Sequence, residues 1–162
     1  MNSSQALADL LERTVREEYE QLSRVEDGPA TKRPNRPSGA GWSQREELGH
    51  LVDSAAYNHQ RFFLAPLARA FAGPGYDADA VVAAHRWAEW RWDDLVRAWR
   101  DQNAALGPLI RRIPDESLST PCAIGDDPPV TLGFLIEDYL VHMRHHVDQI
   151  LWRRPVTKYP RE

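Results

Sequence analysis

The chain has 162 residues, of which 42% are hydrophobic and 27% charged, and its formal net charge is -4 at pH 7. These values are typical of a folded globular protein, so we expect a single domain over residues 1–162 and exclude a disordered chain. The acidic balance argues against a nucleic-acid-binding surface, and the lack of a long apolar run excludes a membrane span. The chain has one cysteine, Cys122, which excludes an internal disulfide. We therefore expect a cytoplasmic protein.

Helical periodicity dominates the first part of the chain. Apolar residues recur at three- and four-residue spacing over 4–25, which predicts an amphipathic helix. A loop rich in proline and glycine follows over 27–41, and it could be a lid or a connection without a functional role. A second helix is predicted to run from Ser43 to about residue 70, because Ser43 and Glu46 form the S-x-x-E pattern of a capping box.

Two further helices are predicted in the second half of the chain. The third begins near 79, reaches Gly107-Pro108, where a kink or an early end is expected, and stops by Pro114. The fourth begins after Thr131, which can act as its N-cap, and ends near Arg153-Arg154. No segment alternates at period two for long enough to indicate a sheet. The expected fold is therefore all-α, a four-helix bundle, in which metal sites are commonly built between facing helices.

Three of the six histidines fall within the stretch HMRHH of the last predicted helix. His142 and His146 are one turn apart on one face, whereas His145 points about 100° away from His146. The pair lies at the edge of the apolar face, between packed core and accessible space. An i, i+4 histidine pair can place two imidazoles on one cation, and the alternative is a pair of hydrogen-bonded histidines without a metal.

A third metal ligand would have to come from another helix, and His50, His59 and His85 are the candidates. His50 and His59 lie on opposite faces of the second helix, so they cannot serve the same site. His50 has polar residues at one-turn spacing, whereas His85, beside Arg86, is expected to be structural or exposed.

Three segments together resemble one known family: GWSQREELGHLVDSAAYNHQRF (41–62), WDDLVRAWRDQN (92–103) and PCAIGDDPPVTLGFLIEDYLVHMRHHVDQI (121–150). They are similar to the DinB/YfiT-like superfamily of metalloenzymes. The resemblance implies a four-helix bundle, frequently a homodimer, that binds zinc or nickel through three histidines. The pattern W-S-x-x-E-x-x-x-H falls on His50, and the pattern H-x-x-x-H falls on His142 and His146.

The resemblance also indicates the kind of reaction. Some relatives look like hydrolases, and others are similar to thiol S-transferases that use bacillithiol, mycothiol or glutathione. Three histidines leave a coordination position open, as in catalytic sites. We therefore expect a divalent-metal-dependent enzyme that acts on a small-molecule substrate, of thiol S-transferase type, with a low-molecular-weight thiol as cosubstrate. A metal-dependent hydrolase and a non-catalytic, stress-related dimer that binds a metal or ligand are the alternatives.

Four residues near the histidines are candidates for supporting roles. Asp138 and Asp53 could each accept an imidazole N–H, and a solvated or capping role is the alternative for both. Arg61 shares the face of His50 and suits a substrate carboxylate, unless it forms a salt bridge within the bundle. Tyr57 could orient a substrate or be part of the core. The last-helix motif ends His-Val-Asp-Gln where the family commonly has H-R-G-Q, so the resemblance does not extend to a particular substrate.

Overall fold

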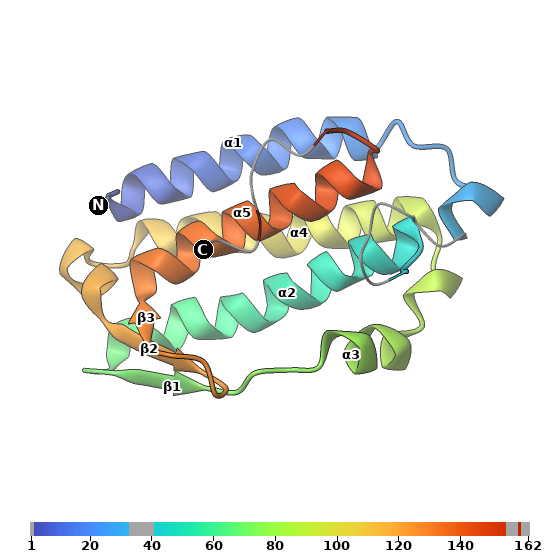
Figure 1. The fold of residues 1–162 in the computed structure, drawn as a ribbon. Helices are drawn as coiled ribbons and strands as arrows, with labels where there is room; N and C mark the ends of the chain where they lie inside the picture. The colour runs from blue at the N-terminus through green and yellow to red at the C-terminus, as the bar shows by residue number, and fades with distance from the viewer. Residues whose placement is uncertain (1, 33–40, 155–158, 160–162) are drawn as a thin grey trace.

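Four long helices lie alongside one another in the computed structural model, which describes residues 2–32, 41–154 and 159 (Figure 1). They are α1 (Ser4–Leu22), α2 (Gln44–Leu64), α4 (Trp92–Arg111) and α5 (Leu132–Ile150). Helix α4 packs against α1 and α2, and α5 closes the bundle against α2 and α1. The predicted all-α four-helix bundle is confirmed.

Two helix starts follow from their capping residues. The Ser43 side chain accepts the N–H of Glu46, and the Glu46 carboxylate accepts the N–H of Ser43 at 2.8 Å. This is the reciprocal pair of a capping box, and it fixes the first turn of α2 seven residues before His50. At the start of α5 the Thr131 hydroxyl accepts the N–H of Phe134 at 3.1 Å. Both predicted caps are confirmed.

The predicted third helix is wrong in its first half. It is divided into α3 (Ala78–His85), a short 3-10 turn (Trp87–Glu89) and α4. The break falls at Arg86, which has a left-handed conformation with φ of 54° that no α-helix can continue through. Helix α4 then continues through Pro108, with no early end at Gly107-Pro108.

A small sheet lies at one end of the bundle, contrary to the expectation that the chain contains none (Figure 1). Strand β1 (Phe71–Gly73) pairs in parallel with β2 (Pro121–Ile124), which pairs antiparallel with β3 (Val130–Thr131). Helix α2 accordingly ends at Leu64 and not near residue 70, because the chain has to reach β1. The sheet joins the segment after α2 to the segment before α5.

Tryptophan packing brings the α3–α4 connection onto α2. Trp92 and Trp99 are fully buried in the core, and the ring of Trp87 covers Gly49 so closely that a Cβ there would lie 2.1 Å from the ring. Only glycine permits this approach, one residue before His50. The backbone around His50 is thus held by the core.

Two expectations bear on the surroundings of the bundle. Residues 33–40 of the loop predicted over 27–41 lie outside the described residues, so its role as a lid stays a prediction. No helix in the described ranges has the combination of length and apolar character that a membrane span requires.

Candidate metal centre

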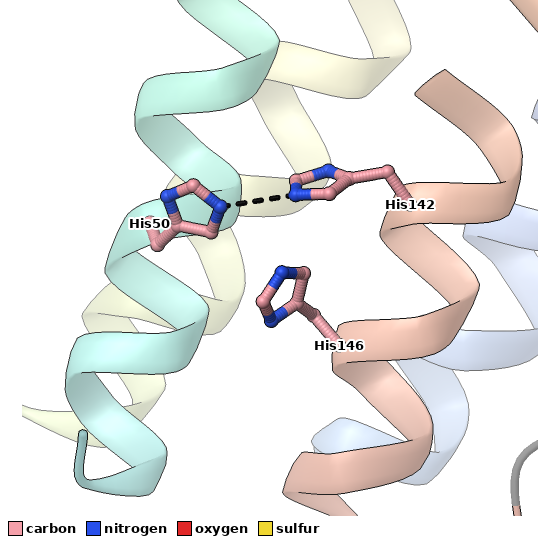
Figure 2. A group of neighbouring side chains, drawn as sticks. All are labelled: His50, His142 and His146. Carbon is pink, nitrogen blue, oxygen red and sulfur yellow. Dashed lines mark hydrogen bonds between the residues drawn. The ribbon is translucent and has the colours of Figure 1, made fainter. Parts of the chain in front are cut away.

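The α5 pair lies as the helical spacing predicts. The ring centroids of His142 and His146 are 4.5 Å apart, and both side chains point toward α2 (Figure 2). His145 is a neighbour of His146, with ring centroids 5.6 Å apart, but it is not part of the group of converging nitrogens. His59 is exposed, so it lies outside this group as well.

Helix α2 supplies the third imidazole. His50 Nε2 lies 3.0 Å from His142 Nε2, and one nitrogen from each of His50, His142 and His146 lies within 4.8 Å of the other two (Figure 2). His50 is buried, whereas His142 and His146 are half-buried. The structure therefore brings together the three histidines that the spacing and the resemblance select.

Burial keeps two of these imidazoles neutral. Loss of solvent, and then the charge of His146, lowers the pKa of His50 to about 3. The same causes, with further contributions from His50 and His145, hold the pKa of His142 well below its usual value. Neutral imidazole is the form that binds a metal, so both rings are ready to act as ligands at neutral pH.

Glu47, which the sequence interpretation missed, orients the third imidazole. Its side chain is fully buried, and one carboxylate oxygen lies 2.5 Å from His146 Nδ1. A carboxylate only accepts, so the proton on this bond belongs to Nδ1 and the lone pair of His146 is on Nε2. Glu47 is three residues before His50, and this i, i+3 spacing is the signal that places both on one face of α2.

Aromatic rings surround the triad. Trp42 lies against His50 and His146, with ring centroids 4.9 and 6.4 Å apart. Tyr159 lies 5.2 Å from His142, centroid to centroid. These apolar walls restrict water around the imidazoles and strengthen electrostatic interactions there.

The donor set fits a divalent cation. Tetrahedral ligation at about 2.1 Å separates imidazole nitrogens by roughly 3.4 Å, which lies between the 3.0 Å contact of His50 with His142 and the 4.8 Å limit of the group. Burial keeps His50 and His142 neutral, and one side of the group adjoins a cavity at His142. Among the described residues this is the one cluster of histidine, cysteine and carboxylate side chains with such convergence.

The two aspartates predicted to accept an imidazole N–H lie in different surroundings. Asp53 is buried, and its oxygens contact the indole N–H of Trp87 at 2.8 Å and His85 Nδ1 at 2.7 Å, so it anchors the α3–α4 connection and not His50. His85, half-exposed, is outside the triad. Asp138 lines the same cavity as His142.

A cavity of about 350 Å³ adjoins the triad at His142. It is lined by residues of α2, of α5, of the segment before α3 and of the β2–β3 turn. Arg61 is among them, and its guanidinium donates to the carbonyl of Pro74 at 3.1 Å. Tyr57 does not line the cavity itself, but it stacks on the lining residue Tyr76 with ring centroids 4.1 Å apart. Both predicted candidates therefore lie on the cavity side of α2.

Acid is expected to destabilise the chain in the absence of metal. Unfolded histidines bind protons near pH 6.5, whereas folded His50 and His142 do so only at much lower pH. Below pH 6.5 the unfolded state therefore binds more protons, and the free energy of unfolding falls by up to about 1.4 kcal/mol per pH unit for each histidine. Urea denaturation between pH 7.5 and 5.5 in the presence of a chelator measures this slope.

The variant His50→Gln is the matched control for that titration, because it removes one of the two contributing groups. Its slope should be smaller than that of the wild type. Equal slopes would show that His50 is not held neutral by the fold.

Comparison with known proteins places these features in a family. A family model described as the DinB superfamily matches residues 6–150. The solved structure of YfiT from Bacillus subtilis, described as a probable metal-dependent hydrolase with an unusual four-helix bundle topology, is similar with a TM-score of 0.77 and 20% identity, over 91% of this chain and 83% of that one. No curated protein matches the chain significantly. At this identity the likeness to YfiT shows the shared fold alone.

Proposed function

The chain belongs to the DinB superfamily, and on that premise we propose that it is a divalent-metal-dependent enzyme that acts on a small molecule. The observation that carries the proposal is the meeting of the triad and the cavity at His142, which both shares the converging nitrogens and lines the 350 Å³ space. A ligand site closed on all sides would be structural, whereas one that adjoins a substrate-sized cavity suits catalysis.

Each protein group has a defined task in this proposal. His50, His142 and His146 hold the cation, and Glu47 keeps the proton of His146 on Nδ1 so that Nε2 faces the site. When bound, the cation supplies Lewis-acid activation of a nucleophile near neutral pH. Asp138 lines the cavity beside His142, where its carboxylate can take up a proton from the attacking group.

The reaction we propose is thiol S-transfer. The sulfur of a low-molecular-weight thiol forms a bond to an electrophilic carbon, and the bond from that carbon to its leaving group breaks. Asp138 takes up the thiol proton and passes it on to the leaving group or to water. This reaction rests on the resemblance to thiol transferases of the family, and zinc or nickel is the metal we expect. The three-histidine set and the adjoining cavity suit a thiol as well as water.

Hydrolysis is the second candidate, because the structurally similar YfiT is described as a probable metal-dependent hydrolase. Water would then replace the thiol as nucleophile, with the same three histidines holding the cation. Thiol transfer needs an added thiol and hydrolysis does not, so one experiment distinguishes the two reactions.

The test is conjugation by the metal-loaded protein. Glutathione, bacillithiol and mycothiol are each incubated with monochlorobimane, and the rate is compared with that of chelated protein and of the His142→Ala variant. We expect at least one thiol to give a metal-dependent rate about tenfold or more above both controls. Metal-dependent cleavage of 4-nitrophenyl esters without any thiol reaction would establish the hydrolase instead. Failure of both reactions in a protein that binds metal would favour the non-catalytic binding protein.

A further inference from the structure

Arg61 is the unusual charge of the cavity. Seven arginines form ion pairs with carboxylates among residues 2–32, 41–154 and 159, but none of these pairs includes Arg61. Its guanidinium donates to the Pro74 carbonyl at 3.1 Å and to the Asn58 side chain at 3.5 Å, which are both neutral. Within the described ranges this half-buried cation therefore has neutral partners alone, and no carboxylate there pairs with its charge.

Burial confirms that Arg61 differs from an ordinary surface arginine. Loss of solvent lowers the pKa of Arg61, and the smaller opposing effect comes from the phenols of Tyr76 and Tyr57 when they ionise. Arg69, eight residues later, is exposed to solvent. The cavity thus holds a cation at an energetic cost that an anionic ligand would remove.

The lining of the cavity extends from this cation to His142 of the metal centre. Ser54, Asn58 and Arg61 line it on successive turns of α2, continuing the face that begins at His50. Eleven residues separate His50 from Arg61, which is about 16 Å of helix, and Arg61 can reach back toward the N-terminus. A ligand that spans the two ends is therefore on the order of 10 Å long.

Helix α5 forms the wall opposite α2 and shares only the metal end with it. On α5, the lining runs from the apolar Leu135 to the metal end at His142, with Asp138 and Tyr139 between them. Tyr76 and Tyr159 add aromatic surface. The body of the ligand therefore meets aromatic rings as well as polar groups, which are Ser54 and Asn58 on α2 and Asp138 on α5.

We propose that the cavity binds an elongated small molecule with one terminal carboxylate, that Arg61 binds this carboxylate, and that the opposite end of the molecule lies at His142. A planar guanidinium matches a carboxylate in geometry and charge. A dianionic phosphate suits the cavity less well, because Arg61 is the one cationic side chain among the described residues of the lining, and Asp127 and Asp138 line the same space. Arg61 is then a specificity-determining residue, and the carboxylate end is held away from the reacting end.

This inference names the substrate class of the proposed enzyme, and it rests on that function for the reaction at the other end. Its test measures binding and not turnover. The probes are 4-phenylbutanoate and 4-phenylbutanamide, which share shape and differ in charge. Isothermal titration of the full chain, both metal-loaded and after chelation, gives the ratio of their dissociation constants.

We expect the wild type to bind the acid about tenfold or more tightly than the amide in both preparations. In Arg61→Gln the two probes should bind equally, whereas Arg69→Gln, the exposed control, should keep the wild-type ratio. Because the ratio is measured on chelated protein too, loss of metal or of turnover would refute the proposed function without touching this inference.

Three results would overturn it. The first is equal binding of both probes by the wild type, including no binding of either up to about 10 mM. The second is an acid preference that survives Arg61→Gln but disappears on chelation, which would put the carboxylate on the metal. If Arg61→Gln binds neither probe, Arg61→Lys decides: a retained preference for the acid supports the charge role, and a lost one is the third contrary result.

Discussion

Alanine at His142 or His146 is expected to abolish metal uptake. Each substitution leaves two ligands, and two imidazoles do not hold a divalent cation in a site that normally needs three protein ligands. Wild-type protein loaded with zinc or nickel and then dialysed should retain about one equivalent, and each variant should retain less than about a tenth of an equivalent. His50→Ala should behave in the same way, because its nitrogen lies 3.0 Å from that of His142. Elemental analysis of the dialysed proteins is the measurement.

His145→Ala and His59→Ala are the matched controls for this experiment. His145 neighbours His146 on the same helix, and His59 is on the same helix as His50, but neither belongs to the converging group. Both variants should bind metal as the wild type does. Equal losses in all five variants would show that the metal is held by surface histidines in general and would refute the triad.

Replacing Glu47 by glutamine is expected to weaken metal affinity by about 10- to 100-fold without unfolding the bundle. The carboxylate accepts the Nδ1 proton of His146, which fixes the tautomer and makes the ring a better donor. Glutamine has the same shape but no charge, and its amide can rotate to present a donor to the ring. Competition with a chromophoric chelator measures the dissociation constant.

Glu46→Gln is the control, because the adjacent residues Glu46 and Glu47 have different roles in α2. Glu46 completes the capping box with Ser43, and glutamine can keep that hydrogen bond but loses the negative charge that favours a helix N-terminus. Glu46→Gln should therefore lower thermal stability slightly and leave metal affinity near that of the wild type. If Glu47→Gln binds metal as tightly as the wild type, or if both variants lose affinity to the same extent, Glu47 has no positioning role.

The ligand set was accessible to sequence reasoning because it depends on local geometry. His142 and His146 are related by one helical turn, and the caps at Ser43 and Thr131 place the starts of the two contributing helices. Pairing these helices required the bundle architecture and the family resemblance. Once the helices face each other, His50 is the second-helix histidine whose face carries polar neighbours.

What could not be predicted depends on contacts between segments distant in sequence. Asp53 is close to His50 along the chain, yet its partners are His85, at the end of α3, and Trp87, in the turn that follows. The break at Arg86 falls inside a helical apolar pattern, where packing of the following Trp87 onto Gly49 overrides periodicity. The strands have only two to four residues each, too few for an alternating pattern to register.

The separation between the first ligand and the second has a consequence for folding. His50 and His142 are 92 positions apart, and α3, α4 and the sheet all belong to the chain between them. Bringing these two nitrogens together therefore closes a loop that contains more than half of the protein, at an entropic cost that the assembled bundle has already met. A cation bound by this site recognises the native state and not the unfolded chain, so its free concentration enters the folding equilibrium directly. The melting temperature of this protein therefore depends on the free metal concentration as well as on the sequence.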